Sequence, residues 1–566
     1  MAQRRARGRA GTDRRSRRPR PPHPAGLVVA TVFAMVAMTP SLLPRDWLYQ
    51  ALVSGISGAL GYGVGVALAW VLRRVPAWRR LLASARARVP EDVAPRLRPA
   101  LAVTALLALV LMLVVGARWQ RAMTAAIGMP APSTADWLRA APLLVLIAAV
   151  LVLAARGVWG VSRRFDRFLE AHLRWPHTVA SAVAAVLVLG AVLLVDDLLL
   201  RRGLSTADAV FAARNDQDHP GVRQPRAQER TGSSASSVPW ESLGREGRRF
   251  VAQGPTPAQL RSAGAVGAPT TPIRVYAGIE SAETPRGRAA LAVEELERTG
   301  AFDRSVLLVA TTTGSGWVNG PAVEALELMY GGDTAAVATQ YSYLPSWLSF
   351  LTDRSRATDE ARALTAAVEE RVEALPEGDR PLLLAYGESL GSYGSENAFT
   401  SLADIRERLD GVLWVGPPNA NQIWHALVER RDPGTPALAP VYASGLLVRF
   451  AGDAQQITTP PTAWEPPRAL YLQHASDPVV WWSPDLLLSE PDWLRERPDG
   501  VDRPVLRWFP LVTFWQLTFD LLNAKSVPDG HGHNYDALAL DGWVAVAAPD
   551  GWTSADTERV RAVLGP

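Results

Sequence analysis

Residues 381–391 read PLLLAYGESLG, an apolar run that ends in a glycine-flanked serine. A short apolar run of this kind is typical of a buried strand, and the residues after it have a helical composition. A strand–turn–helix around the pattern G-x-S-x-G holds the serine on a sharp, exposed turn. Gly387 and Gly391 suit the crowded crossing of strand and helix, and Glu388 stands directly before the serine. The stretch therefore predicts a nucleophile elbow with Ser389 at its tip.

Short apolar runs alternate with helix-like segments on both sides of this stretch, from about residue 272 to residue 566. Such alternation predicts a doubly wound, mostly parallel sheet with helices on both faces. The predicted domain, residues 272–566, is long enough to bury a large core. The strands that we expect are Ile273–Ile279, Ser305–Thr313, Ala335–Gln340, Pro381–Tyr386, Val412–Val415 and Leu470–Gln473.

A serine hydroxyl is a weak nucleophile that needs a base, and the base needs an acid to orient it. Around a nucleophile elbow, the acid and then the histidine follow the serine along the chain. Asp477 comes directly after a strand-like run and is the expected acid, with Asp453 as the competing one. The histidines that follow Asp477 are His531 and His533, in a glycine-rich loop. We expect His533 to be the base, with His531 as the alternative.

Acyl transfer also needs two backbone amides that converge on the developing oxyanion. One is the amide of the residue after the nucleophile, here Leu390. The second comes from a loop after an early strand, which in this sequence is TTGSGW at residues 312–317. We expect Thr313 or Gly314 to supply it. A phosphate-binding loop is the rival interpretation, but the segment lacks the lysine of a P-loop.

A metal site built from Asp477, His531 and His533 is another alternative, but no H-E-x-x-H spacing accompanies these residues. The chain contains no cysteine. This excludes a cysteine nucleophile, a disulfide scaffold and a cysteine-ligated metal. We therefore expect neither a metal nor a cofactor.

The first third of the chain is far more apolar than the rest. Five apolar runs there have about the length, roughly 20 residues, that a helix needs to cross a bilayer. They predict an all-α transmembrane domain of about five helices over residues 25–203, preceded by an Arg-rich tail at residues 1–24. The runs are Ala25–Leu43, Trp47–Leu72, Ala100–Trp119, Ala140–Gly157 and Thr178–Leu200.

Arginines predict the orientation of this domain, because cytoplasmic connections carry the excess of basic residues. Nine of the first 24 residues are arginine and eight more lie from Arg73 to Arg98, whereas Arg45 stands alone between the first two runs. The N-terminus is then cytoplasmic, and five crossings place the catalytic domain on the extracytoplasmic side of the cell membrane. The net charge of +4 thus reports orientation, and we expect no nucleic-acid partner. Cleavage of the first run as a signal peptide is the alternative, but no clear small-x-small site follows it.

Residues 204–271 separate the two domains. Their polar, Ser- and Arg-rich composition predicts a linker. Within the second run, Gly61 and Gly65 have the GxxxG spacing that lets helices approach closely. We expect this spacing to serve packing within the chain, and we keep homo-oligomer formation through these helices as a further prediction.

Aromatic side chains gather in the catalytic domain. The chain has 20 tryptophans, and aromatic clusters lie at residues 341–350, 481–488 and 508–519. Aromatics with a polar handle suit the membrane–water interface. Ordinary core packing is one interpretation of these clusters, and an apolar acyl pocket or membrane-facing lid is the functional one.

Several short segments carry a resemblance to a known family: LGREGR at 243–248, TGSGWV at 313–318, QYS at 340–342, PSW at 345–347, GESLG at 387–391, HASDP at 474–478 and GHGH at 530–533. With these the chain resembles, over its full length, the actinobacterial integral-membrane α/β-hydrolase family. Its members join an N-terminal multi-helix membrane domain to a C-terminal α/β-hydrolase domain. The resemblance implies Ser389, Asp477 and a histidine of the GHGH segment as a triad, and it implies no particular substrate.

These features together predict a membrane-anchored serine hydrolase, esterase- or lipase-like, that acts on an acyl ester. A tethered hydrolase with an aromatic mouth would meet membrane lipids or acylated cell-envelope polymers. The alternatives are an acyltransferase with the same triad and a non-catalytic membrane protein that keeps the fold as a binding module. A transporter is disfavoured because the helices carry few ionisable groups at mid-depth.

Overall fold

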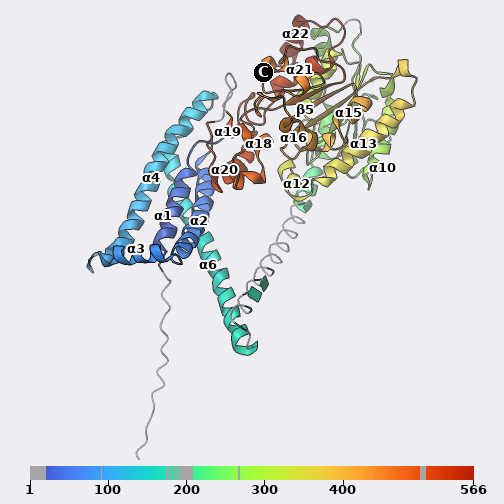
Figure 1. The fold of residues 1–566 in the computed structure, drawn as a ribbon. Coiled ribbons are helices and arrows are strands. Elements are labelled where there is room, and N and C mark those ends of the chain that lie inside the picture. The colour runs from blue at the N-terminus through green and yellow to red at the C-terminus, as the bar shows by residue number, and fades with distance from the viewer. Residues whose placement is uncertain are drawn as a thin grey trace, which may run out of the picture.

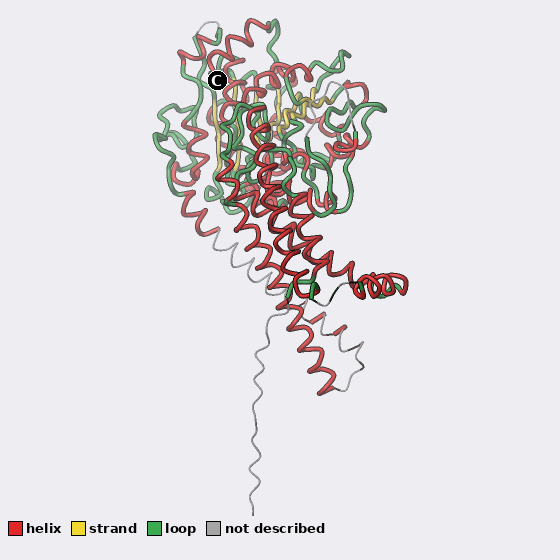
Figure 2. The backbone as a smooth tube through the Cα atoms, turned by 90° about the vertical axis from the view of Figure 1, so that its left-hand side faces the viewer, coloured by secondary structure: helices red, strands yellow, loops and turns green. Residues whose placement is uncertain are grey.

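The computed structural model describes residues 21–565, apart from residues 89, 91, 266–267 and 497–504 and most of residues 174–207. Figure 1 shows a bundle of N-terminal helices beside a larger domain in which helices surround a sheet. In Figure 2, the strands lie within the larger domain and the bundle extends away from it. The predicted fold class, a helical N-terminal domain followed by an α/β domain, is confirmed.

One parallel sheet of seven strands forms the centre of the larger domain, in the order β1-β3-β2-β4-β5-β7-β6. The strand that carries the elbow, β4, lies in the middle between β2 and β5. The short β6 is not among the expected strands, since Arg449 interrupts its apolar run. The strands are β1 (Ile273–Ala277), β2 (Val306–Thr311), β3 (Thr334–Thr339), β4 (Leu382–Glu388), β5 (Gly411–Val415), β6 (Val448–Ala451) and β7 (Arg468–Leu472).

Each face of the sheet buries its own apolar cluster, because successive side chains of a strand point to opposite faces. In β2, Leu307 and Val309 belong to one cluster, whereas Val306 and Leu308 belong to the other. The first cluster is covered by α10 (Pro285–Thr299), α13 (Ser355–Glu373), α15 (Leu402–Arg408), α16 (Gln422–Glu429) and α20 (Val512–Leu521). The second is covered by α8 (Gly244–Ala252), α11 (Gly320–Met329), α21 (Asp536–Ala547) and α22 (Ser554–Leu564).

Three helices of the described N-terminal region are long and apolar enough to cross a membrane, at Trp47–Leu72, Pro95–Ala126 and Thr134–His172. They keep apolar side chains such as Leu107 and Leu111 exposed, at 64% and 67%, as expected of a lipid-facing surface. The helices of this region are α1 (Pro24–Val36), α2 (Trp47–Leu72), α3 (Pro76–Ala87), α4 (Ala94–Ala126), α5 (Thr134–Leu138) and α6 (Ala140–Leu173).

The first predicted membrane run is too long. The helix α1 has 13 residues, which is too few to cross a bilayer alone. Pro40 and Pro44 cannot continue a helix, and residues 37–46 instead turn toward the catalytic domain. The fifth predicted run, Thr178–Leu200, lies largely outside the described residues, so the count of five helices stays a prediction.

The GxxxG face of α2 is occupied by α1. A methyl group at Gly65 would lie 2.4 Å from the carbonyl oxygen of Ala25, and one at Gly61 would lie 2.8 Å from Cβ of Phe33. At Gly63, between them, a methyl group would meet nothing within 4 Å. The close helix approach is therefore made within the chain, and homo-oligomer formation stays a prediction.

Much of the predicted linker is packed against the α/β domain. Arg230 forms a parallel bridge with Arg274 of β1. The buried carboxylate of Glu295 in α10 accepts hydrogen bonds from the hydroxyls of Thr231, at 3.0 Å, and Ser236, at 2.9 Å. The prediction of a flexible linker is wrong for residues 215–237, because polar side chains of this segment bond to buried groups of the α/β domain.

Candidate active site

The serine of the elbow stands where β4 passes into α14 (Leu390–Glu396). Ser389 has φ 56° and ψ −126°, a conformation that a non-glycine residue adopts only when its surroundings impose it. The glycines beside it are required by close contacts. A methyl group at Gly387 would lie 2.5 Å from the carbonyl oxygen of Gly391, and one at Gly391 would lie 2.4 Å from that of Thr311. The strand–turn–helix predicted around Ser389 is thus the structure that forms.

His533 and Asp477 form a buried pair at the carboxyl ends of the strands. Nδ1 of His533 lies 2.6 Å from Oδ2 of Asp477, and the two side chains are 3% and 0% exposed. With the Nδ1 proton donated to the carboxylate, Nε2 of His533 presents a lone pair. Nε2 is buried and makes no hydrogen bond among the described residues. A base with an oriented ring and an unused nitrogen is the arrangement that activates a hydroxyl.

Backbone contacts connect this pair to the elbow. The amide of Ser389 donates to the carbonyl oxygen of Val415 at 2.8 Å. The next residue, Gly416, has φ 53°, and a methyl group there would lie 2.3 Å from Cε1 of His533 and 3.1 Å from Oδ2 of Asp477. The end of β5 therefore touches the serine on one side and the His–Asp pair on the other.

The competing residues lie elsewhere. His531 is partly exposed and makes no side-chain hydrogen bond in the described part of the chain. Asp453 is exposed and caps α17 (Ala454–Ile457), where it accepts from the amide of Gln456 at 2.8 Å. The structure brings His533 and Asp477 together, and it does so with neither His531 nor Asp453.

Three side chains hold the loop that carries His533. The hydroxyl of Tyr535 donates to Oδ2 of Asp477 at 2.7 Å and accepts from the amide of His474 at 2.8 Å. Nδ1 of His474 lies 2.9 Å from the carbonyl oxygen of Gly532, and the ring stacks on that of Tyr535. The amide of Gly532 donates to the hydroxyl of Ser476 at 3.0 Å. Burial lowers the pKa of His474 below its ordinary value, which favours the neutral form of the ring.

The three expected oxyanion donors differ in whether their amides are already bonded. The amide of Thr313 donates to the carbonyl oxygen of Trp317 at 2.9 Å, so it is already used. The amides of Leu390 and Gly314 make no hydrogen bond among the described residues. A methyl group at Gly314 would lie 2.4 Å from the carbonyl oxygen of Leu344, so this position needs glycine. Leu390 and Gly314 remain the pair of available donors.

Glu388 is part of a charged network that sequence reasoning did not predict. Its buried carboxylate lies 2.6 Å from Nζ of Lys525 and accepts from the side-chain amide of Asn319 at 2.7 Å. Burial alone would raise the pKa of Glu388, but Lys525, His533 and Asn319 together hold it below its usual value. The ammonium also lies 4.1 Å from the ring centre of Trp317, in the oxyanion loop. This lysine, the only one in the chain, thus joins three segments around the site.

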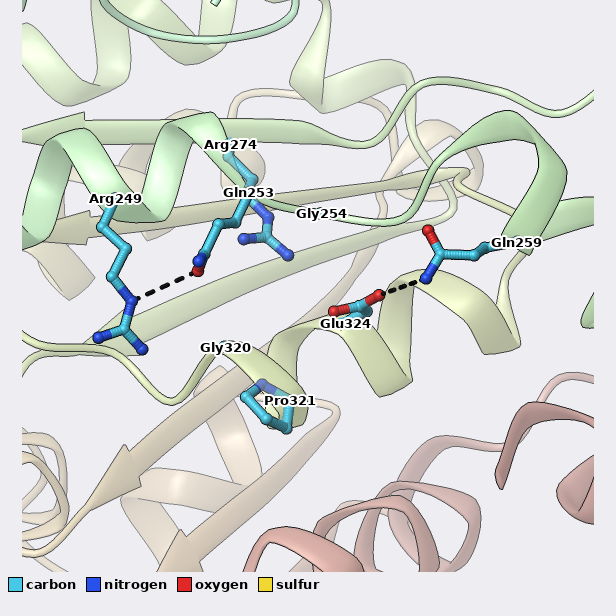
Figure 3. A pocket seen from close by; sticks show the side chains of 8 residues that line it. All are labelled: Arg249, Gln253, Gly254, Gln259, Arg274, Gly320, Pro321 and Glu324. Carbon is cyan, nitrogen blue, oxygen red and sulfur yellow. Dashed lines mark hydrogen bonds between the residues drawn. The ribbon is translucent and has the colours of Figure 1, made fainter. Parts of the chain in front are cut away.

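A polar cavity of about 360 Å³ lies apart from these residues (Figure 3). Arg249, Gln253, Gln259 and Glu324 line it, and none of the elbow, His–Asp or oxyanion residues does. The arginine and glutamate side chains are engaged with the neighbouring glutamines. The described residues contain no cluster of three or more His, Asp or Glu that could hold a metal ion.

Comparison with known families covers both parts of the chain. Residues 273–560 match the family model described as alpha/beta-hydrolase family, and residues 38–255 match the model described as the N-terminus of that family. No curated protein and no solved structure matches the chain. The first match includes more than half of the residues, and with them Ser389, Asp477 and His533.

Proposed function

This chain belongs to the alpha/beta-hydrolase family, and we propose that it is a membrane-anchored serine hydrolase that cleaves an acyl ester. The observation that supports this most is the buried pair of His533 and Asp477 beside the strained elbow of Ser389. Structural networks of histidine and aspartate also occur in ordinary cores. Here, however, Nε2 of His533 is left without a partner among the described residues. Burying an unpaired polar atom costs free energy, so its presence calls for an explanation, and a catalytic role is one.

In the first half of the proposed reaction, Nε2 of His533 takes the proton of the Ser389 hydroxyl. The hydroxyl oxygen then attacks the ester carbonyl carbon, and the amides of Leu390 and Gly314 donate to the oxyanion. Asp477 stabilises the imidazolium that forms. Collapse breaks the bond to the alcohol, which leaves with the proton from His533. The products of this half are a free alcohol and an acyl group on Ser389.

In the second half, water gives its proton to His533 and attacks the acyl carbonyl, which releases a carboxylic acid and the free serine. An alcohol in place of water would give a new ester, so the same residues also serve an acyltransferase. Analysis of products with an added alcohol acceptor separates the two outcomes. Free acid as the main product in the presence of acceptor is the expected result.

The surroundings of the site favour an apolar acyl group. The short helix α12 (Ser346–Thr352) exposes Trp347 and Leu351, at 50% and 61%. Phe350 of the same helix packs against the buried cluster that contains Leu390. From Phe350, ring contacts continue to Trp482 at 6.4 Å and then to Phe514 of α20 at 5.5 Å. An element that packs beside the residue after the nucleophile and shows apolar side chains outward suits a lipid or acylated envelope substrate.

The position of the bundle supports an extracytoplasmic site. The catalytic domain meets the bundle at residues 37–46, and Ile127 and Met129, after α4, pack against its apolar cluster. The Arg-rich connection that contains α3 lies at the far end of the bundle in Figure 1. Under the positive-inside rule, the arginine-poor end with the catalytic domain faces outward.

Single cysteines test this orientation without background, because the chain has none of its own. Glu407→Cys places a thiol on an exposed position of α15, and Ser84→Cys places one on the exposed side of α3. A membrane-impermeant maleimide should label Glu407→Cys in intact cells and Ser84→Cys only in permeabilised cells. The reverse pattern would refute the proposed orientation.

A fluorophosphonate probe on membranes tests the nucleophile. Wild-type protein should be labelled, and Ser389→Ala should not. Ser395→Ala is the matched control. Ser395 is a buried serine of α14, the helix that begins directly after Ser389, and its hydroxyl accepts from Nε1 of Trp414. This variant should still be labelled. Equal labelling of wild type and Ser389→Ala would remove Ser389 as the nucleophile.

A further inference from the structure

The loop between α1 and α2 leaves the membrane bundle and enters the catalytic domain. Leu42 and Leu43 are 6% and 1% exposed. Both belong to the apolar cluster that also contains residues of the sheet, among them Leu307 of β2 and Leu383 of β4. A loop that merely joined two membrane helices would not need to bury leucines in another domain.

A buried carboxylate holds this loop in place. Asp520 of α20 accepts from the hydroxyl of Ser41 at 3.0 Å and from the amide of Leu42 at 3.1 Å. Nε of Arg45 lies 3.4 Å from Oδ1 of Asp520, and both side chains are fully buried. Charges taken out of water persist only when they are paired and hydrogen-bonded, so this loop is fixed to α20.

Arg45 also ties the loop to the bundle. Its guanidinium donates to the carbonyl oxygen of Thr39 at 3.1 Å, and its backbone amide donates to the side chain of Gln120 in α4 at 2.8 Å. Gln516 of α20 donates to the same Thr39 carbonyl at 3.2 Å. Arg45 therefore connects the loop after α1 with α20 through its side chain, and the same loop with α4 through its backbone amide.

The same part of the catalytic domain supports the catalytic histidine. Just after α20, the carbonyl oxygen of Ala524 accepts from the amide of His533 at 2.8 Å, and the side chain of Asn523 donates to the carbonyl oxygen of Pro44 at 2.8 Å. A methyl group at Gly532 would lie 3.3 Å from Cδ2 of Leu43. The loop of the membrane domain thus packs against the residue directly before the histidine and bonds to the segment that accepts from the histidine's amide.

We infer that the α1–α2 loop is a positioning element for His533, held by the ion pair between Arg45 and Asp520. The inference rests on the proposed function, since it assigns to this loop the orientation of the proposed base. It means that the active site is complete only when the membrane helices are folded against the catalytic domain. A chain released from the membrane, or one not yet assembled, would then carry Ser389 without a correctly placed base.

The test compares two buried ion pairs in the full chain, purified in detergent micelles. Arg45→Ala removes the pair beside the His533 loop. Arg274→Ala is the matched control, because Arg274 and Glu327 are each 1% exposed, lie 2.7 Å apart and are not in contact with the site. Two quantities are measured: the rate constant of fluorophosphonate labelling per folded molecule, and hydrogen exchange of the peptide that contains residues 530–534.

We expect Arg45→Ala to slow labelling about 100-fold, the effect of a misplacement of roughly 1 Å in a catalytic group. It should also speed exchange at residues 530–534, where the amide of His533 bonds to Ala524. Arg45→Lys should restore part of the rate, since it keeps the charge. Arg274→Ala should label at the wild-type rate per folded molecule and leave that exchange unchanged.

The inference is overturned if Arg45→Ala labels at the wild-type rate, or if both variants slow equally. Failure of the proposed function looks different, because the wild type itself would then show no labelling that depends on Ser389. In that case the exchange measurement alone decides. Faster exchange at residues 530–534 in Arg45→Ala but not in Arg274→Ala would still support the role of the loop, and equal exchange would reject it.

Discussion

The helix α4 and the strand β2 are both strongly apolar, yet β2 buries its side chains and α4 leaves many of its side chains exposed. All six residues of β2 are buried, whereas α4 leaves Leu107 and Leu111 about two-thirds exposed. The sheet buries apolar surface against protein, whereas the bundle leaves it exposed, as a helix that faces lipid would. Apolar content thus identifies both regions, but it does not reveal whether an apolar side chain is buried in protein or exposed on the surface. The segments between the two regions are where the sequence-based predictions fail for this reason.

The largest expected effect concerns the proposed proton transfer by His533, which belongs to the sheet region. His533→Ala should lower the rate of ester hydrolysis roughly 10⁴-fold, because the nucleophile loses its base. The measurement is the rate constant on a soluble p-nitrophenyl ester. His531→Ala, on the same loop, should change it by less than about 3-fold. A comparable loss in both variants would mean that the loop matters but not the proton transfer to His533.

The second prediction tests close packing at Gly416, directly after the carboxyl end of β5. Gly416→Ala would place a methyl group 2.3 Å from Cε1 of His533, and we expect a loss of about 100-fold in the same rate. Gly434→Ala is the control, since Gly434 also has a positive φ, 87°, but its methyl group would meet nothing within 4 Å. Both variants carry the backbone penalty of roughly 1 kcal/mol. Equal activities of the two variants would show that the packing of Gly416 against His533 does not affect the reaction.

The strand–helix pattern and the order of motifs were enough to predict the sheet and to single out Ser389, Asp477 and His533 for attention. The role of Gly416 was not predictable, because it depends on how the end of β5 meets a loop more than a hundred residues later in the chain. Tyr535 and His474 were visible only as neighbours of motif residues. Their hydrogen bonds to Asp477 and Gly532 follow from the fold alone.

The errors arise from the ambiguity that α4 and β2 illustrate. Leu42 and Leu43 looked like the end of a membrane helix, but they are buried in the catalytic domain. The polar residues before β1 looked like a solvated linker, but Thr231 and Ser236 bond to the buried Glu295. In both cases the composition is as expected, but the groups that these side chains contact could not be predicted, because they lie far away in the sequence.

A third prediction tests whether the exposed side of α4 faces lipid. Leu111→Arg places a charge on the exposed side of α4, which should cost about 3 kcal/mol of membrane insertion. The measurement is the fraction of protein that resists alkaline extraction from membranes, and we expect it to fall several-fold. Leu382→Arg, at a position of β4 that is 41% exposed, should leave that fraction unchanged. An unchanged fraction in Leu111→Arg would mean that this side of α4 does not face lipid.

The smallest effect concerns pH. Burial lowers the pKa of His474 from its ordinary value of 6.5, so the unfolded chain binds this proton more readily than the folded one. The stability contributed by the neutral ring is therefore complete above pH 6.5 and is lost as the pH falls below it, by at most about 1.4 kcal/mol per pH unit. Wild-type protein in micelles should lose more of its Tm between pH 7 and pH 5 than His474→Gln. Equal losses in the two proteins would exclude His474 as the source.

The proposed reaction passes through a covalent intermediate at Ser389, whose mass can be measured directly. Protein incubated briefly with p-nitrophenyl esters of increasing chain length is quenched in acid, digested and analysed by mass spectrometry. We expect the mass of the acyl group on the peptide that contains Ser389, and no added mass on that peptide in Ser389→Ala. An acyl group on another residue, or none in wild-type protein that still hydrolyses the ester, would contradict the proposed reaction.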